Sequence, residues 1–235
     1  MQEQYLDKNE NAEGYFDNTK TKLLDLIPLK LRGGDLLEIG AASGNTLIYA
    51  KKNGYAENIY GVELCDIKNS NQENKLLSDF IIGNIEEIEL PYNKESFDVI
   101  LCGDVLEHLV DPYKIVNTLR KYLKKDGVFI SSIPNIRKLS ILKTIFVNGD
   151  FKYADHGILD KTHLRFFTKK NMINLFEDNG YTVINIIPSD TCNVKRYLKR
   201  LRFIRLFKCL LSAIFKEFFT IQYYLVAKKN IEHTD

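Results

Sequence analysis

The chain has 235 residues, of which 45% are hydrophobic and 27% are charged. This composition allows one domain with a buried core, and it excludes a wholly disordered or fibrous protein. The net charge of +2 hides an asymmetry, because residues 190–220 hold eight basic and two acidic residues, which leaves a charge of −4 on the rest of the chain.

The sequence predicts a cytoplasmic protein. Its four cysteines, at positions 65, 102, 192 and 209, have neither the CxxC pattern nor the spacing of metal ligands, which is typical of reduced thiols. The first residues lack the basic and then apolar pattern of a signal peptide. No apolar run approaches the roughly 20 residues that a membrane-spanning helix needs.

Short apolar runs alternate with amphipathic stretches along the chain, which is typical of a parallel α/β sheet. Strands are predicted at 35–40, 58–63, 80–83, 97–102, 127–133, 181–187 and 222–227. Helices are predicted at 20–27, 45–53, 112–124 and 169–179, and Asp111 and Thr168 precede the last two as N-caps. Residues 134–167 are predicted to be irregular and to form an insertion on the substrate side.

A turn rich in small residues follows the first predicted strand, and such a turn lets a ligand approach the backbone at a helix N-terminus. It fits the dinucleotide pattern GxGxxG poorly, because Ala42 and Asn45 stand at the second and third glycine positions. It fits ExGxGxG better, at Glu38, Gly40 and Gly44, again with Ala42 in the middle. A turn that only packs a helix closely against the sheet remains an alternative.

Two later strand ends also suggest a nucleoside cofactor. Glu63 ends the second predicted strand, where an acid can accept hydrogen bonds from both ribose hydroxyls. NAD enzymes share that acid, and a solvated glutamate is the structural alternative. After the third strand, the Asn84 side chain can accept from an adenine amino group while the Ile85 N–H faces a ring nitrogen.

Together these motifs resemble the class I S-adenosylmethionine-dependent methyltransferases over residues 15–187, with the last strand returning near residue 222. In order they read EIGAASG, GVE, GNIEEIELPY, FDVILCGDVLEHLVDP, LKKDGVFISSIPN and HLRFFTKKNMINLFEDNGY. The resemblance is strongest to the branch with ubiquinone-type and glycan-modifying O-methyltransferases. It implies one Rossmann-like domain over 1–235. Its seven-stranded sheet has the order 3-2-1-4-5-7-6, with strand 7 antiparallel and helices on both faces.

The resemblance also implies where S-adenosylmethionine lies, across the carboxyl ends of the first four strands. Glu38 and the turn backbone would contact its methionine part, Glu63 its ribose, and the backbone of Cys102 and Gly103 its sulfonium. A helical lid over residues 1–30 would bring Tyr15 over the cofactor, although this tyrosine could equally pack in the core. The implied cofactor-binding residues are Tyr15, Glu38, Gly40, Ala41, Ala42, Gly44, Glu63, Leu64, Asn84, Ile85, Cys102 and Gly103.

Three residues are the candidates for catalysis: Glu107 and His108 after the fourth strand, and His163 in the irregular segment. One histidine would be the general base, and the other would position it or the substrate. A sharper version is a divalent metal site made by Asp104 or Glu107 with both histidines, similar to that of the small-RNA 2′-O-methyltransferases. The structural alternative is that Glu107 and His108 only cap a helix. His156 is a weaker candidate in the same segment.

Residues 188–220 form a basic and apolar insertion between the last two strands, predicted as two short helices. It could line the acceptor pocket, form a homodimer contact, or lie on an anionic membrane, whereas binding to nucleic acid ranks last. The predicted function is methyl transfer to an oxygen of a small molecule, a sugar or nucleotide-activated precursor of a bacterial surface glycan. The alternatives are a quinone-like acceptor, metal-dependent RNA 2′-O-methylation, and a non-catalytic partner subunit that binds S-adenosylmethionine.

Overall fold

The computed structural model describes residues 18–189 and 216–230. The strands are β1 (Gly34–Ile39), β2 (Ala56–Glu63), β3 (Asp79–Ile82), β4 (Phe97–Gly103), β5 (Leu123–Pro134), β6 (Tyr181–Pro188) and β7 (Gln222–Lys229). The α-helices are α2 (Thr21–Leu24), α3 (Asn45–Lys52), α4 (Pro112–Arg120), α5 (Leu139–Asn148) and α6 (Lys169–Glu177). Three 3₁₀ helices are η1 (Leu29–Leu31), η2 (Leu106–His108) and η3 (Lys216–Phe219).

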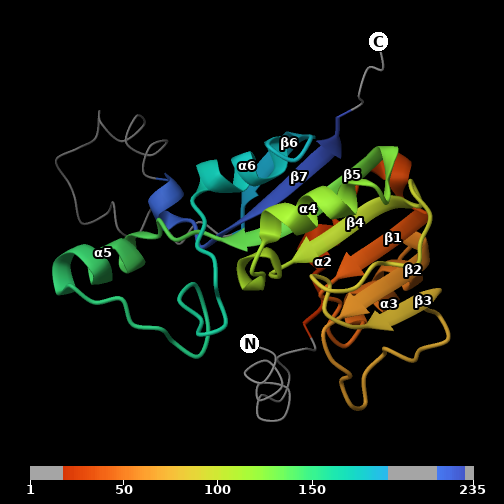
Figure 1. The fold of residues 1–235 in the computed structure, drawn as a ribbon, viewed down its shortest axis with the longest axis horizontal. Helices are drawn as coiled ribbons and strands as arrows, with labels where there is room; N and C mark the ends of the chain where they lie inside the picture. Colours follow the sequence, from red (N-terminus) through yellow and green to blue (C-terminus); the bar gives the residue numbers. More distant parts are fainter. Residues whose placement is uncertain (1–17, 190–215, 231–235) are drawn as a thin grey trace.

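The seven strands form one sheet in the order β3-β2-β1-β4-β5-β7-β6. β1 to β5 pair in parallel, whereas β7 runs antiparallel to both β5 and β6. Figure 1 shows α4 and α6 in front of this sheet, with α2 and α3 behind it. The predicted fold class, strand order and antiparallel strand 7 are therefore confirmed.

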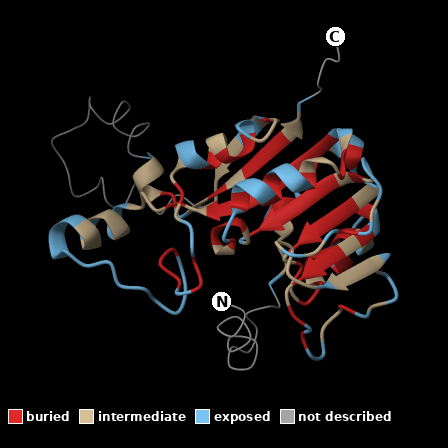
Figure 2. Ribbon diagram, in the orientation of Figure 1, coloured by how far each residue is buried: buried red, intermediate tan, exposed pale blue. Residues whose placement is uncertain are grey.

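The sheet is buried on both faces, which is why its central strands are almost continuously apolar. On one side Phe129 and Phe176 pack edge to face, with ring centroids 5.1 Å apart. On the other side Leu47 of α3 lies in a second cluster with Ile59. Figure 2 shows buried residues concentrated in the strands, with exposed residues along the outer faces of the helices.

Both predicted N-caps are present. The side chain of Asp111 accepts a hydrogen bond from the Lys114 N–H (3.0 Å), and Pro112 is the first residue of α4. Thr168 caps α6 through a reciprocal capping box with Asn171. These caps fix the helices that follow the two segments carrying the predicted catalytic residues.

The predicted boundary between the helix at 112–124 and the strand after it is wrong. The predicted helix 112–124 ends at Arg120, and β5 begins at Leu123 rather than at residue 127. Leu123 pairs with Phe97 of β4, and the Tyr122 carbonyl accepts from the Phe97 N–H (3.0 Å). The apolar residues at 122 and 123 fit a helical stripe and a strand start equally well, so their spacing alone could not decide between the two.

The segment predicted as irregular contains a regular helix, α5, which corrects that prediction. None of its ten residues is fully buried, and its apolar residues lie on more than one side, half-buried at Ile141, Leu142 and Ile145 and exposed at Phe146 and Val147, so no single stripe marked a helix. The first predicted helix is also shorter, with only Thr21–Leu24 in α-helix. Tyr15 and most of the insertion 188–220 lie outside the described residues. Within the described part, no helix has the length and apolarity to cross a membrane.

Candidate functional site

Two adjoining cavities open at the carboxyl ends of the parallel strands, the edge to which the arrows of β1, β2 and β4 point in Figure 1. The larger has a volume of about 620 Å³ and lies over β1, β2 and the turn after β3. The smaller, of about 320 Å³, lies between the turn after β4 and residues 156–163. Gly40, Asp104, Val105 and His108 line both cavities, so a group in one can meet a group in the other.

The turn after β1 is shaped by left-handed residues. Gly40 and Gly44 have φ of +67° and +78°, and Ala42 between them has φ of +49°. At Gly40 a Cβ atom would lie 2.2 Å from Val105 Cγ2, so only glycine fits beside the turn after β4. Ala42 fills the position where the family prefers glycine, and its left-handed backbone explains that preference.

Glu63 joins this turn to β2. Its carboxylate accepts hydrogen bonds from the Ala42 and Leu64 N–H groups, each at 2.7 Å. It is buried, which raises the pKa of its carboxyl group, while hydrogen bonds from the backbone of Ala42, Leu64 and Cys65 oppose that rise. A carboxylate has about four lone-pair sites, so Glu63 keeps capacity to accept from a hydroxyl group in the larger cavity, which it lines.

The far end of the larger cavity is formed by the turn after β3. Asn84 and Ile85 line it, as predicted for an adenine pocket. The Asn84 side chain is already engaged, because its oxygen accepts from the Glu86 N–H (3.0 Å) and its NH₂ donates to Glu87 (2.8 Å). To recognise adenine, the Asn84 side-chain oxygen would therefore have to accept a hydrogen bond from the adenine amino group in addition to the one from the Glu86 N–H.

The other predicted cofactor residues divide into two groups. Ala42 and Gly103 line the smaller cavity. Among the described residues, Glu38, Ala41, Gly44 and Cys102 lie behind the surface and line neither cavity. Tyr15 lies outside the described residues. The structure thus places part of the predicted set at the cavities and the rest in the framework that supports them.

Glu38 is fully buried and is held by a residue that the sequence analysis missed. Lys20 Nζ lies 3.2 Å from Glu38 Oε1 and donates to the Gly40 carbonyl at 3.0 Å. Burial alone would lower the pKa of Lys20, but the carboxylates of Glu38 and Asp104 outweigh it and raise that pKa. Lys20 lines the smaller cavity, and so it places a positive charge where the two cavities meet. No pattern in the sequence connects positions 20 and 38.

The predicted catalytic residues come together around the smaller cavity. The Glu107 carbonyl accepts from the N–H groups of Leu164 and Arg165, both at 2.9 Å. This pair of hydrogen bonds fastens η2 to the segment that carries His163. The rings of His108 and His163 lie 4.7 Å apart between centroids, at an interplanar angle of 80°. His156 lines the same cavity.

Backbone carbonyls fix how both histidine rings are oriented. His108 Nδ1 lies 3.1 Å from the Thr162 carbonyl, and His163 Nδ1 lies 3.0 Å from the Ile158 carbonyl. A carbonyl only accepts hydrogen bonds, so we assign the proton to Nδ1 in each neutral ring. Nε2 of each ring then carries the lone pair, as a general base or a metal ligand requires.

Two carboxyl groups accompany the histidines. Glu107 is buried, and among the described residues neither of its carboxyl oxygens has a hydrogen-bond partner. Burial, together with the charge of Asp104, raises the pKa of Glu107 well above its ordinary value. Burial also raises the pKa of Asp104, whose Oδ1 accepts from Ser132 (3.0 Å) and from the Gln222 side chain. The smaller cavity therefore holds acidic groups that favour a proton or a cation.

The same cluster has the donor set of a divalent metal site. Glu107, His108 and His163 each offer one ligand atom, and these three atoms lie within 4.8 Å of one another. Metal-bound histidines commonly donate their other ring N–H to a carbonyl or carboxylate, as both histidines do here. The unpartnered Glu107 carboxylate would supply the oxygen ligand.

Gln222 is a second site residue that was missed, although the sequence held a signal for it. It begins β7, opposite Pro134 at the end of β5. An antiparallel strand starts at the edge where its parallel neighbours end, so the predicted strand order already placed the first residue of β7 beside the site.

The backbone of Asp104 is a further feature of the site that the sequence did not indicate. Asp104 has a left-handed φ of +58°.

Comparison with known proteins identifies the family of this chain. Residues 10–186 match the family model described as a methyltransferase domain. The ubiquinone biosynthesis O-methyltransferase of Rickettsia prowazekii is 28% identical over 144 residues, which are 57% of this chain and 48% of that protein. The enzyme of the same name from Haemophilus ducreyi is 35% identical over 77 residues, 31% of this chain and 33% of that protein. The chain thus matches about half or less of the length of these two relatives.

Solved structures with the same fold include a S-adenosylmethionine-dependent methyltransferase from Archaeoglobus fulgidus, with a TM-score of 0.65, 16% identity and coverage of 92% and 97% of the two chains. Another is the 1,6-didemethyltoxoflavin-N1-methyltransferase of Burkholderia thailandensis, crystallised with bound 1,6-didemethyltoxoflavin and S-adenosylhomocysteine. Its TM-score is 0.64, at 13% identity and 98% and 87% coverage. The fold, the cavities at its strand ends and the family match lead to one conclusion: the chain belongs to the methyltransferase domain family, with the class I S-adenosylmethionine-dependent fold.

Proposed function

We propose that this protein transfers the methyl group of S-adenosylmethionine to an oxygen atom of a small molecule. The observation that carries the proposal is the pair of adjoining cavities, one lined by the predicted nucleoside-binding residues and one by three histidines and three carboxyl groups. His108 lines both, at the place where a methyl donor and an acceptor would meet.

The bound cofactor would supply an activated methyl group on its sulfonium, so alignment is the main task of the protein. Glu63 would accept from the ribose hydroxyls. Lys20, beside the Gly40 carbonyl, would attract the negative carboxylate of the methionine part. His108 or His163, each with a lone pair on Nε2, would remove the proton from the acceptor hydroxyl.

For the acceptor, we favour a sugar or a nucleotide-activated precursor of a bacterial surface glycan, acted on in the cytoplasm. The polar lining of the smaller cavity supports this choice, since Lys20, Asp104, Asp160 and Gln222 can each bind a hydroxyl group. A quinone-like aromatic acceptor is the second candidate. Its support is the name of the curated relatives, and its hydroxyl group would need the same base.

A metal-assisted form of the reaction is favoured by one specific observation, the buried Glu107 carboxylate without a hydrogen-bond partner in the described structure. Glu107, His108 and His163 would hold a divalent cation that lowers the pKa of the acceptor hydroxyl. Activity that falls with a chelator and returns with Mg²⁺, Mn²⁺ or Zn²⁺ supports this form. Activity that a chelator does not change would instead support a histidine acting as the general base without a metal.

The test is methyl transfer from radiolabelled S-adenosylmethionine to a panel of nucleotide-activated sugars, catechols and RNA 3′ ends. Labelled sugar is the expected product, and labelled catechol would move the proposal to the second candidate. Labelling of RNA alone would contradict a small-molecule acceptor. Tight cofactor binding with no transfer to any class would instead favour a non-catalytic partner subunit.

A further inference from the structure

The helix α5 presents apolar side chains to solvent instead of to the core. Leu139, Phe146 and Val147 lie on one side of it, at helical spacing, and Phe146 and Val147 are 80% and 73% exposed. In a globular protein the apolar side of a surface helix normally faces inward. Figure 1 shows α5 at the end of an arm that extends away from the sheet. The helix therefore carries an apolar face that the described part of the chain leaves exposed.

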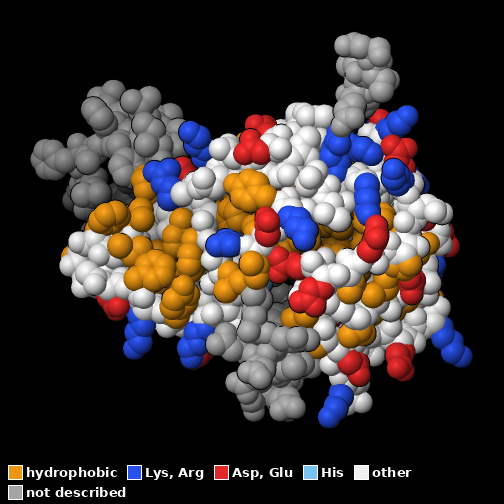
Figure 3. All heavy atoms as spheres, viewed as in Figure 1, with side chains coloured by type: hydrophobic (Ala, Val, Ile, Leu, Met, Phe, Trp, Pro, Cys, Tyr) orange, Lys and Arg blue, Asp and Glu red, His pale blue; other side chains and the backbone are white. Residues whose placement is uncertain are grey.

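Aromatic residues after α5 extend this surface toward the site. Phe151 and Tyr153 are exposed, and their rings lie 5.5 Å and 6.2 Å from that of Phe166. Phe166 in turn lies 6.5 Å from His163, again between ring centroids. Leu139, Phe146, Val147, Phe151 and Tyr153 are called the α5 patch below. Figure 3 shows hydrophobic side chains gathered over this end of the molecule.

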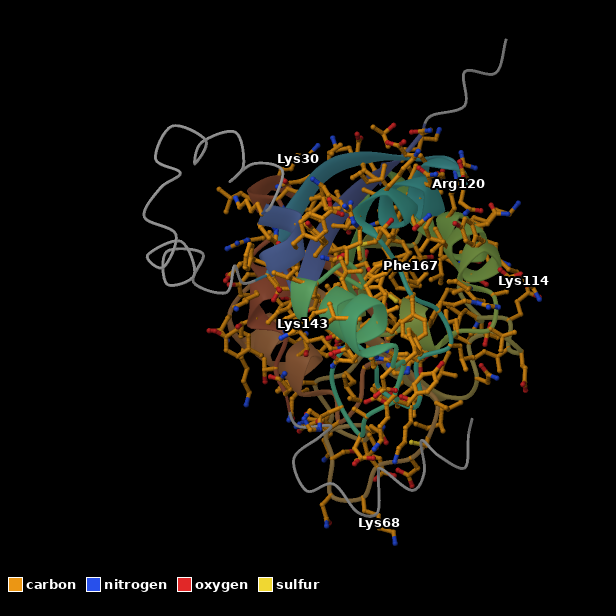
Figure 4. All side chains as sticks on the ribbon, turned by 90° about the vertical axis from the view of Figure 1, so that its left-hand side faces the viewer. Lys30, Lys68, Lys114, Arg120, Lys143 and Phe167 are labelled. Atoms are coloured by element: carbon orange, nitrogen blue, oxygen red, sulfur yellow. The ribbon has the colours of Figure 1, made fainter. Side chains whose placement is uncertain are left out.

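The charge around the α5 patch is positive. Lys138, Lys143 and Lys152 border it, and Asp150 is the single acidic residue in residues 136–153. Figure 4 looks onto this end of the molecule and shows Lys143 on α5, far from Lys68 at the lower edge. An exposed apolar patch with a basic border matches the chemistry of a bilayer surface that contains anionic lipids.

The base of α5 is tied to the end of the basic insertion. Arg137 forms an ion pair with Glu217 (3.0 Å) and stacks over the Phe218 ring (4.7 Å). Asn135 donates to the carbonyls of Glu217 and Thr220. Residues 190–215 lie outside the described structure, but their sequence holds seven basic residues and one acidic residue, and they rejoin the described chain at η3. The segment with the highest positive charge in the sequence thus rejoins the described chain at η3, which contacts the base of α5.

We infer that the α5 patch docks on an anionic lipid bilayer. The side chains of Phe146, Val147, Phe151 and Tyr153 enter the interfacial region of the bilayer. Lys138, Lys143 and Lys152 contact the anionic lipid headgroups. A second copy of the chain fits less well, because two basic borders would face each other. One consequence rests on the proposed function: the acceptor is presented at a membrane surface, since the α5 patch leads through Phe166 to His163.

The test is sedimentation of the full-length protein with vesicles of phosphatidylglycerol and phosphatidylcholine in equal parts, against vesicles of phosphatidylcholine alone. We expect binding to the anionic vesicles that weakens with salt. The double variant Phe146→Ser/Val147→Ser should bind at least about tenfold more weakly, because two large side chains no longer leave water. Leu29→Ser is the matched control, since Leu29 in η1 is also 80% exposed but lies outside the α5 patch.

The charge is tested separately with Lys138→Glu/Lys143→Glu, which should remove the preference for anionic vesicles, and with Lys68→Glu, which should not. The inference is overturned if the wild type does not bind, or if the double variant binds as the wild type does. It is also overturned if the wild type is a dimer that the double variant dissociates, since a second copy then covers the α5 patch. Methyl transfer to a soluble acceptor by the double variant reports on the proposed function independently.

Discussion

His108 and His163 are 55 positions apart in the sequence, yet their rings meet at 4.7 Å between centroids. The contact depends on the backbone, because the Glu107 carbonyl accepts two N–H groups from the His163 segment. Each ring also has its Nδ1 at a carbonyl, which leaves Nε2 with the lone pair. Two histidines fixed in this way have the geometry that the proposed acid–base or metal-binding pair requires.

Replacing either histidine should slow the reaction without loosening the cofactor. We expect His108→Ala and His163→Ala each to lower kcat/KM by about 10²- to 10⁴-fold, the usual contribution of a general base or of its partner. Calorimetric titration with S-adenosylhomocysteine should give affinities near that of the wild type. Normal turnover in both variants would show that these residues are structural.

The close approach of Gly40 to Val105 makes a second prediction. Gly40→Ala should weaken cofactor binding by at least about tenfold, because the new methyl group would lie 2.2 Å from Val105 Cγ2. The double variant Gly40→Ala/Val105→Ala should recover part of this loss in the same titration.

Gly33→Ala is the control for backbone strain alone, since Gly33 has a φ of +79° but open space around its Cβ position. It should cost about 1–2 kcal/mol of stability and leave cofactor affinity unchanged. Equal effects of Gly33→Ala and Gly40→Ala on affinity would rule out the steric explanation.

The ion pair of Lys20 and Glu38 should be strongly coupled. Lys20→Met leaves a fully buried carboxylate without its cation and should lower the free energy of unfolding by about 3 kcal/mol. Glu38→Gln in the same chain should restore much of this loss, as measured by urea denaturation in a double-mutant cycle. Strict additivity of the two changes would mean that the pair does not act as a unit.

Lys124 gives a prediction about pH. It lies 2.8 Å from Asp35 and 2.7 Å from Asp98, and its side chain is one-third exposed. Burial alone would raise the pKa of Asp35, but hydrogen bonds from Lys124 and Asn58 outweigh it and lower that pKa below 3.8. The stabilisation is therefore present above about pH 3.8 and is lost as the pH falls through the folded-state pKa.

The variant Lys124→Ala should cost about 1 kcal/mol near pH 7, a value limited by solvent screening. Burial lowers the pKa of Lys124, but hydrogen bonds to the two carboxylates outweigh it and raise that pKa above 10.5, so the cost should also shrink at very high pH. Urea denaturation at pH 7 and near pH 3, with the exposed Lys52→Ala as control, checks both the size and the direction. A cost that grows on acidification would contradict this assignment.

The sheet could be predicted because its strands are continuous apolar runs and its turns hold residues with special backbone angles. Asp111, Thr168 and the turn at Gly40 are all features of this local kind. The start of β5 could not be predicted, since Leu123 fits two periodicities. Helix α5 escaped prediction for a related reason: its apolar residues lie on more than one side, some half-buried and some exposed, so no single stripe marks it.

The site could be predicted only where its residues belong to strand ends. Glu63 ends β2, Asn84 lies two residues after β3, and both line the larger cavity. Lys20 reaches Glu38 through a fold of the chain that leaves no sequence pattern. The contact of His108 with His163 followed from the family resemblance, whereas its hydrogen bonds to backbone carbonyls needed the structure.

Calorimetric titration of the wild type and of Glu63→Gln with S-adenosylhomocysteine tests the central claim most directly. The account predicts one site per chain in the wild type, competition with S-adenosylmethionine, and binding at least about tenfold weaker in the variant, because an amide accepts fewer hydrogen bonds than a carboxylate. Absence of binding by the wild type, or equal binding by both proteins, would contradict the assignment of the larger cavity to this cofactor.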